Sequence, residues 1–346
     1  MKTHPEIRNE QELEEALARP SAELVDMMRR LPGDVMLLGA GGKMGPSMAR
    51  LARNAIREAG TEKRVLAVSR YSNPDARRAV EETGAEAIAA DLTQPEEVTA
   101  LPRVENVIYM LGRKFGETGS EGLTWIANVA APHLVARHFA GSRFVVFSTG
   151  CVYPLASPRQ GLPTEGTPPE PVGEYAYSCL GREQVFAHHG AESGSPVLLY
   201  RLNYAVDLRY GVLVDIARDV LEGRPVDLTV SWFNCIWQGD ANNRALLCLE
   251  RARVRATPLN ITGPELLSTE ETARRFGELL GRKVEFVGSD SGQAYLSDAS
   301  RSTSWFGPPQ VGADELIEMV AAYIQAGGKL HGKPTKFQVT DGKFTG

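Results

Sequence analysis

The chain has 346 residues, 42% hydrophobic and 23% charged, which suits a globular protein with a sizeable core. Its net charge of -5 and its scattered basic residues argue against a nucleic-acid binder. The N-terminus is charged where a signal peptide would be apolar, and no apolar run approaches the roughly 18 residues of a membrane helix. The sequence therefore predicts a cytoplasmic protein with no membrane or nucleic-acid partner.

The cysteines and histidines suggest neither a disulfide framework nor a metal site. Cys151, Cys179, Cys235 and Cys248 stand far apart and lack metal-ligand spacing, so we interpret them as reduced thiols. The six histidines include no HExxH pattern, so no metal centre is predicted.

Strand-like and helix-like segments alternate along the first two thirds of the chain. A helical region at 9–31, acidic at its start and basic at its end, precedes them. Short apolar strands between amphipathic helices are typical of a parallel sheet covered on both faces. The predicted strands are 35–40, 64–70, 85–92, 106–112, 143–150 and 196–203, and the predicted helices begin at Pro46 or lie within 74–84, 93–98, 124–140 and 174–190.

The C-terminal part is less regular, with helices predicted at 211–225, 269–282 and 313–328 and a strand at 284–288. The pattern predicts an α/β fold: a doubly wound, Rossmann-type parallel sheet with a smaller, mostly C-terminal substrate lobe. We divide the chain into an N-terminal helical extension (1–32), a dinucleotide-binding domain (33–203), a substrate lobe with segments returning to that domain (204–330) and a polar tail (331–346).

The first predicted strand runs into a glycine-rich turn and then a helix. A tight turn, a backbone that touches pyrophosphate and a helix start packed on a strand each favour glycine, and the helix N-terminus then faces the phosphates. The strand before the turn and the helix and strand after it are the context that this motif needs. The turn predicts a dinucleotide site with the spacing GxxGxxG, formed by Gly39, Gly41, Gly42, Lys43, Met44 and Gly45.

The end of the second predicted strand bears on the choice between NAD and NADP. An acid there would bind the ribose hydroxyls of NAD, and an arginine would suit the 2′-phosphate of NADP. The chain has Ser69 and Arg70 with no acid at the strand end, and Lys43 adds a cation beside the phosphates. The cofactor is therefore NAD or NADP with a slight lean towards NADP; the alternative is that Arg70 is a solvated loop charge.

The fifth predicted strand ends in FSTGCVYP, and Tyr175 follows 26 residues after Thr149. With the glycine turn, these segments resemble the extended short-chain dehydrogenase/reductase family of the NAD-dependent epimerase/dehydratase type, over roughly residues 33–330. The resemblance implies a homodimer through the helices at about 124–140 and 174–189. It also places near the cofactor, or on the helix beside it, Asp91, Leu92, Leu111, Gly112 and Asn128.

The resemblance also implies catalytic roles. In that family a tyrosine phenol gives or takes a proton as hydride moves to or from the nicotinamide, and a serine or threonine holds the substrate oxygen. These places fall to Tyr175 and to Thr149, with Ser148 beside it. Each residue also has a structural alternative. The Thr149 hydroxyl could instead form a hydrogen bond to the backbone at the strand end, and Tyr175 could be a half-buried residue of the helix.

The chain departs from the family pattern at Cys179, where a lysine is usual. A free tyrosine has a pKa of about 10, and a nearby cation would help it ionise. Cys179 cannot supply that charge, and as a thiolate it would raise the tyrosine pKa. Three explanations stay open: another cation substitutes (Arg182, Arg113 or Lys114), the reaction needs less from the phenol, or catalysis is lost.

The substrate is expected to be a small carbohydrate-like molecule. The stretch LTVSWFNCIWQGD lacks the arginine with which nucleotide-sugar enzymes of this type often grip a diphosphate, which favours a sugar or sugar acid. Lys114, Asn203 and Arg209 are candidate substrate contacts, with surface or packing roles as the alternative. We predict an NAD(P)-dependent oxidoreductase or epimerase/dehydratase; the alternative is a catalytically impaired NAD(P)-binding regulatory or structural protein. The predicted catalytic set is Ser148, Thr149, Tyr175 and Cys179.

Overall fold

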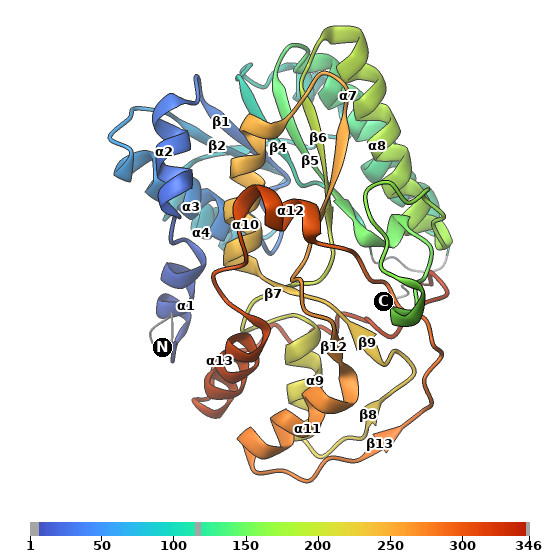
Figure 1. The fold of residues 1–346 in the computed structure, drawn as a ribbon. Helices are drawn as coiled ribbons and strands as arrows, with labels where there is room; N and C mark the ends of the chain where they lie inside the picture. Colours follow the sequence, from blue (N-terminus) through green and yellow to red (C-terminus); the bar gives the residue numbers. More distant parts are fainter. Residues whose placement is uncertain (1–6, 115–118, 344–346) are drawn as a thin grey trace.

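The computed structural model describes residues 7–114 and 119–343, and Figure 1 shows a sheet-based upper part above a lobe of helices and short strands. Seven strands form the central sheet in the order β11-β6-β5-β4-β1-β2-β3, each pairing in parallel with its neighbours. This confirms the predicted α/β fold. The strands are β1 (Val35–Leu38), β2 (Val65–Ser69), β3 (Glu86–Ala89), β4 (Asn106–Tyr109), β5 (Arg143–Thr149), β6 (Val197–Leu202) and β11 (Thr257–Ile261).

Helices cover both faces of this sheet because alternate strand residues point to opposite sides. Val35 and Leu37 belong to the core on one face, and Met36 and Leu38 belong to the core on the other. The first face packs against α2 (Ala22–Arg30), α3 (Gly45–Glu58) and α10 (Gln238–Leu247). The second packs against α5 (Pro95–Thr99), α7 (Ala131–His138) and α8 (Gly173–Ser193), while α4 (Pro74–Glu81) lies beside α3 and β3.

The helix predicted over 124–140 is a continuous stretch with a wider turn in its middle. Its parts are α6 (Glu121–Trp125), the π-helical turn η1 (Ile126–Ala130) and α7. Asn128 lies buried in the π turn; its Nδ2 donates to the Arg113 carbonyl at 3.0 Å and to Ser178 Oγ at 2.9 Å. Its Oδ1 accepts from the Arg113 N–H at 2.9 Å. The π turn, a feature common at functional sites, thus ties α8 to the segment after β4.

The lower lobe has a hydrophobic core of its own, built by α9 (Val212–Leu221), α11 (Thr269–Leu280) and α13 (Ala313–Gln325). Its strands are two residues long and pair as β7 (Ala205–Val206) with β10 (Ile236–Trp237), β9 (Trp232–Phe233) with β12 (Leu267–Ser268), and β8 (Val226–Asp227) with β13 (Phe286–Val287). The remaining elements are α12 (Ser300–Phe306) and the short 3-10 turns Gly150–Val152, Pro158–Gln160 and Cys248–Arg251.

The N-terminal region is two helices rather than the single helical segment predicted at 9–31. α1 (Glu10–Leu17) ends before Pro20, which cannot continue a helix, and Ser21 caps α2 by accepting from the Leu24 N–H. Leu13 of α1 joins the lower-lobe core, whereas α2 joins the core on the sheet. The extension therefore packs on both parts of the molecule.

Strand β11 and helix α10 are not among the predicted elements, because neither has a clean hydrophobic pattern. Pro258 in β11 is tolerated because the strand lies at the sheet edge. α10 is polar but buried, and its side chains find partners: Gln238 Nε2 and Asn242 Nδ2 donate to Ser47 Oγ at 3.1 and 3.0 Å. Burial of paired polar groups leaves no periodic signal in the sequence.

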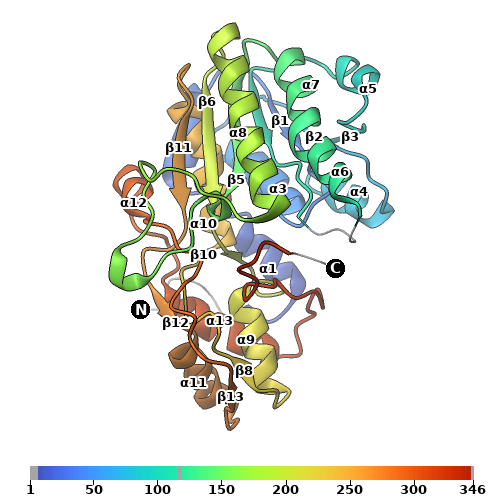
Figure 2. The same ribbon diagram turned by 90° about the vertical axis from the view of Figure 1, so that its right-hand side faces the viewer.

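The polar tail, described over residues 331–343, runs between the two parts of the molecule, and its end lies between α8 and α9 in Figure 2. Thr335 and Phe337 are buried, and Phe337 packs near Phe233. The Thr335 N–H and hydroxyl donate to Asp215 Oδ2 in α9 at 2.7 and 2.6 Å. The tail is thus a packed strap.

Within the described ranges, no helix is both long and apolar enough to cross a membrane. The cytoplasmic location stays a prediction.

Candidate active site

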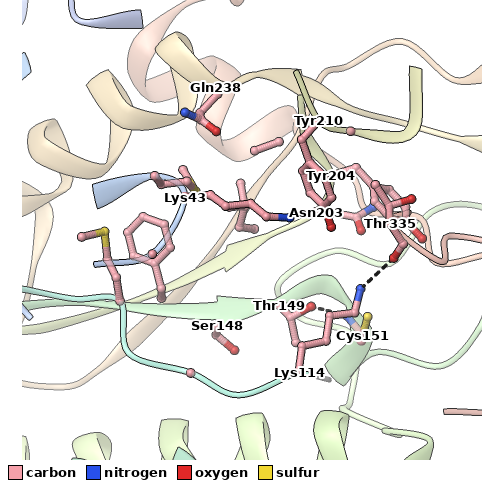
Figure 3. Close-up of a pocket in the computed structure, with 18 of the residues that line it drawn as sticks. Lys43, Lys114, Ser148, Thr149, Cys151, Asn203, Tyr204, Tyr210, Gln238 and Thr335 are labelled. Carbon is pink, nitrogen blue, oxygen red and sulfur yellow. Dashed lines mark hydrogen bonds between the residues drawn. The ribbon is translucent and has the colours of Figure 1, made fainter. Parts of the chain in front are cut away.

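A cavity of about 390 Å³ lies between the carboxyl edge of the sheet and the lower lobe (Figure 3). The glycine turn, the ends of β4, β5 and β6, the start of α8 and the tail all contribute to its wall. Open α/β sheets bind ligands at this edge, so the cavity is the candidate active site. Its lining includes Gly39, Gly42, Lys43, Met44, Gly45, Gly112, Lys114, Ser148, Thr149, Cys151, Tyr175, Arg182, Asn203, Tyr204, Tyr210, Gln238 and Thr335.

The outer two glycines of the turn are required by the fold itself. Gly39 has a φ of +92°, and a Cβ there would lie 2.5 Å from the Leu111 backbone nitrogen. A Cβ on Gly45 would overlap the Ala40 carbonyl oxygen. These two positions hold β1, β4 and α3 at close approach.

Gly42 differs, because a Cβ there would meet nothing closer than the Gly39 carbonyl oxygen at 3.5 Å. That is an ordinary contact, so the fold does not demand glycine, yet Gly42 lines the cavity. α3 begins three residues later, at Gly45, with no side-chain cap and no acid in its first turn. Bare backbone beside an uncapped helix start fits a dinucleotide pyrophosphate.

Lys43 extends from the turn into the cavity towards Tyr210 (Figure 3), with Nζ 2.9 Å from the ring centroid. Burial lowers the pKa of Lys43 to about 8, and the positive charges of Lys333 and Lys114 add to the effect. Its ammonium charge is therefore sensitive to pH near neutrality and available to an anionic ligand.

The residues predicted at the adenosine end lie outside the cavity lining. Arg70 is 68% exposed, and its guanidinium stands 3.9 Å from the Asp91 carboxylate. Asp91 Oδ1 accepts from the Thr93 N–H at 2.9 Å and the Thr93 hydroxyl at 2.7 Å. Burial opposes ionisation of Asp91, but the Thr93 bonds and Arg70 outweigh it and lower its pKa. Ser69 faces the turn, since a Cβ on Gly41 would lie 2.5 Å from its hydroxyl oxygen.

Of the other residues predicted near the cofactor, Leu92 follows β3, and Leu111 and Gly112 follow β4. Leu92 is buried in the core on the α7–α8 face, and Leu111 packs against that core. Gly112 lines the cavity, and a Cβ there would lie 2.9 Å from Arg182 Nη2.

Thr149 and Tyr175 meet at the cavity, one from the end of β5 and the other from the first turn of α8. Their side chains hydrogen-bond to each other, and Thr149 Oγ1 also accepts from the Cys151 N–H at 3.2 Å. Burial raises the pKa of Tyr175 well above 10, Cys179 and Cys151 add to this, and Arg182 and Thr149 oppose it. The phenol is therefore protonated at neutral pH in the free protein.

Ser148 also lines the cavity, but its hydroxyl serves a buried ion pair. It donates to Glu183 Oε1 at 2.5 Å, and Glu183 Oε2 lies 2.6 Å from Arg201 Nη2. Both charged residues are buried. The sequence carried a signal for this pair, because an arginine inside an apolar strand needs a buried acid.

Cys179 is 1% exposed and packs with Val152 and Tyr153, in contact with Tyr175. Burial raises the pKa of its thiol to about 11, against the opposing effect of Arg182. The thiol is neutral at pH 7 and acts as an apolar side chain.

Two of the cations considered as substitutes, Arg182 and Lys114, line the cavity. Arg182 is buried one turn beyond Cys179; Nη1 donates to the Phe147 carbonyl at 2.8 Å and Nη2 to Asn128 Oδ1 at 2.7 Å. Lys114 Nζ donates to the Thr335 carbonyl at 3.5 Å.

The candidate substrate contacts separate into two groups. Asn203 lines the cavity with Lys114, and its Nδ2 donates to Asn234 Oδ1 and the Tyr295 carbonyl, both at 3.1 Å. Arg209 is absent from the lining residues and instead forms ion pairs with Asp207 at 2.8 Å and Glu14 at 2.6 Å. Arg209 thus fastens α1 to the lower lobe.

Several cavity residues were not anticipated from the sequence. Tyr204 has a φ of +47°, which residues other than glycine rarely adopt, and Tyr210 and Gln238 also line the cavity. Thr335 comes from the tail, whose sequence shows no pattern. Only the three-dimensional fold brings these residues to the site.

The fold is a Rossmann-type α/β fold with a cavity at the carboxyl edge of its sheet. The model of the NAD dependent epimerase/dehydratase family matches residues 35–225, more than half of the chain. The protein belongs to this family and is an enzyme of the NAD-dependent epimerase/dehydratase type, which confirms the resemblance. A search of curated protein sequences found no significant match.

Solved structures of similar fold include three sugar-nucleotide enzymes. UDP-glucuronic acid 4-epimerase from Bacillus cereus, in complex with NAD, has a TM-score of 0.70 and 15% identity over 84% of this chain and 98% of that one. UDP-glucose 4-epimerase from Thermus thermophilus, in complex with NAD, has a TM-score of 0.67 and 19% identity over 84% of this chain and 99% of that one. The dTDP-glucose 4,6-dehydratase from Streptomyces venezuelae, with NAD bound, has a TM-score of 0.69 and 19% identity over 84% of this chain and 97% of that one. The slight lean towards NADP gains no support from the family.

Proposed function

We propose that the protein catalyses an NAD-dependent redox, epimerisation or dehydration reaction on a sugar or sugar acid. One observation carries the proposal: a single cavity is lined by the glycine turn, at Gly39, Gly42 and Gly45, and by the Thr149–Tyr175 pair. A cofactor held by the turn and a substrate held by the two hydroxyls would share this cavity.

The roles of the chain's own residues follow from this arrangement. Thr149 donates a hydrogen bond to the substrate oxygen and orients it beside Tyr175. Tyr175, as the phenolate, would accept the proton of the substrate hydroxyl as that carbon becomes a carbonyl, and as the phenol would return it in the reverse reaction. When bound, the nicotinamide supplies the hydride acceptor or donor. Proton and hydride together balance the oxidation of the alcohol.

NAD is the cofactor we propose. Gly42 and the uncapped start of α3 would hold its pyrophosphate, with Lys43 beside them. Arg70 stands 3.9 Å from the Asp91 carboxylate, whose negative charge would oppose a 2′-phosphate beside it.

A small substrate suits the cavity. Its volume of about 390 Å³ lies near the lower end for ligand sites, and the nicotinamide would share it. Lys43 and Lys114 would favour an anionic group such as a sugar carboxylate. The nucleotide sugars named for the similar solved structures are the second substrate class to test.

The proposal is tested in two stages. Calorimetry with NAD and NADP should show tighter binding of NAD. Sugars, sugar acids and UDP-sugars are then incubated with protein and cofactor, following reduced-nicotinamide absorbance and, because epimerisation leaves no net absorbance change, the products by NMR. Conversion of a free sugar or sugar acid supports the proposal; conversion of UDP-sugars alone would contradict the substrate class, and cofactor binding without any turnover would contradict the function.

We also propose that the protein forms a homodimer through the α6–α8 apolar surface, defined as Leu123, Trp125, Ile126 and Tyr177. These side chains are 39–53% exposed and gather on neighbouring helices. Large apolar side chains exposed together on neighbouring helices favour a protein interface. In analytical ultracentrifugation, Ile126→Glu should yield monomers, whereas Val254→Glu, at an exposed valine elsewhere, should not. A wild-type protein that stays monomeric at high concentration would contradict the proposal.

A further inference from the structure

Tyr175 stands in surroundings that oppose its ionisation. Burial and the neighbouring thiols of Cys179 and Cys151 disfavour the phenolate. A phenol that takes a proton near neutral pH needs a nearby positive charge, because such a charge stabilises the anion. The question is which cation of this chain provides it.

Lys114 is a cation that enters the cavity from the segment after β4. Figure 3 shows its side chain beside Thr149 and Cys151, with Nζ directed towards Thr335. Nζ lies 5.9 Å from the centroid of the Tyr175 ring. An opposite charge at about 4–6 Å is close enough to change the ionisation of a buried group.

The charges around Lys114 favour a cation there. Burial is the largest effect and lowers the pKa of Lys114. The carboxylate of Asp215 opposes it and stabilises the ammonium, and the thiols of Cys151 and Cys179 would do the same only when ionised. A negative phenolate at Tyr175 would further stabilise the ammonium of Lys114.

The other cavity cations are directed elsewhere. The two terminal nitrogens of Arg182 donate to the Phe147 carbonyl and to Asn128 Oδ1. Lys43 stacks over Tyr210. Arg182 already lowers the pKa of Tyr175 from its buried position, and Lys114 places a second cation with its Nζ 5.9 Å from the centroid of the Tyr175 ring.

The tail holds Lys114 in place. Its Nζ donates to the Thr335 carbonyl, and the Thr335 N–H and hydroxyl are in turn bound to Asp215 of α9. A residue of the lower lobe therefore sets the position of a lysine that follows β4.

We propose that Lys114, positioned by Thr335 of the tail, supplies beside Tyr175 the positive charge that Cys179 cannot supply. The inference rests on the proposed function for the role of Tyr175. It makes Lys114 a residue that tunes the acid/base group, and Thr335 a positioning residue.

The test is a titration that needs neither substrate nor cofactor. A fluorinated tyrosine, whose phenol is more acidic, is incorporated at position 175, and its ionisation is followed by fluorine NMR. Lys114→Met and Lys114→Gln should each raise the phenol pKa by about one unit or more. Lys114→Arg, which keeps the charge, should stay close to the wild type.

Lys283→Met is the matched control, because Lys283 is an exposed lysine of the lower lobe outside the cavity lining. It should leave the phenol pKa unchanged. Folding of each variant is checked by circular dichroism, and the Gln variant serves if the Met variant does not fold. An unchanged pKa in a folded Met or Gln variant would overturn the proposal, as would an Arg variant that behaves like Met.

Thr335→Val tests the positioning, because it removes one of the two bonds to Asp215 without changing a charge. The phenol pKa should rise by a smaller amount when Lys114 is present and should not rise further when Lys114 is already Met. Equal rises in both backgrounds would overturn the role of the tail. The titration decides the proposal even without a known substrate. If Tyr175 is essential for turnover but its pKa does not change when Lys114 is replaced, this inference fails and the proposed function stands.

Discussion

The glycine turn at Gly39–Gly45 and the start of helix α8 border the same cavity, but different constraints build them. The turn depends on backbone geometry: Gly39 and Gly45 leave no space for a Cβ. The α8 side depends on side chains from distant segments, such as Thr149, Lys114 and Thr335, and on the balance between burial and charge. The turn should therefore be sensitive to shape, and the α8 side to charge and hydrogen bonding.

The largest expected effect lies on the α8 side. Tyr175→Phe removes the proposed proton carrier while keeping the ring, so kcat should fall by about 10²–10⁴-fold with NAD affinity retained. Steady-state kinetics on the substrate found by screening, with calorimetry for NAD, measure both effects. Tyr177→Phe, an exposed tyrosine two residues along the helix, is the control. Unchanged turnover in Tyr175→Phe would remove Tyr175 from the reaction.

The next largest effect concerns the buried ion pair of Glu183 and Arg201, which supports the α8 side of the cavity. Glu183→Gln leaves the Arg201 charge buried without its counter-ion and should lower the free energy of unfolding by about 3–5 kcal/mol. Glu192→Gln, in an exposed pair on the same helix, should cost less than about 1 kcal/mol. Denaturant unfolding measures both. Similar small losses in the two variants would show that the buried pair contributes little.

The difference between the two regions also explains what could be predicted from the sequence. The alternation of strands and helices predicted the fold because each buried strand is a local apolar run. β11 and α10 were missed because their polar residues are buried by pairing with distant partners such as Ser47. The break between α1 and α2 had a local signal in Pro20, which the helical pattern on either side masked.

The candidate site divides in the same way. The turn was predictable because strand, glycines and helix follow one another in the chain. The roles of Thr149 and Tyr175 come from the resemblance and stay predictions. No local pattern marks Thr335, because its place depends on how the tail packs against α9.

Two glycines of the turn separate the needs of the fold from those of the cofactor. Gly45→Ala forces a Cβ against the Ala40 carbonyl and should lower stability by about 1–3 kcal/mol. Gly42→Ala has the room for its methyl group, so its melting temperature should stay near that of the wild type. Its NAD affinity should nevertheless fall about 10-fold, or 1.4 kcal/mol. Unchanged NAD affinity in Gly42→Ala would mean that the pyrophosphate does not touch this backbone.

The smallest expected effect concerns Lys43, which is an exception to the contrast between the two regions. Lys43 belongs to the turn but acts through its charge. Burial first, then the charges of Lys333 and Lys114, lower the pKa of Lys43 to about 8. A bound diphosphate would stabilise its ammonium and raise that pKa, so binding should take up protons near pH 8. NAD affinity should therefore fall, by up to about 10-fold, as pH rises through about 8.

Calorimetry in buffers of different ionisation enthalpy measures this proton uptake directly. Lys43→Met should bind NAD more weakly at pH 7 and show no uptake, whereas Lys283→Met, at an exposed lysine of the lower lobe, should behave like the wild type. Uptake that persists in Lys43→Met would place the titrating group elsewhere. Loss of the uptake in Lys43→Met would show that the turn recognises the cofactor by charge as well as by shape. The turn and the α8 side would then both depend on charge, and they would differ in that the α8 side is built by residues from distant segments of the chain.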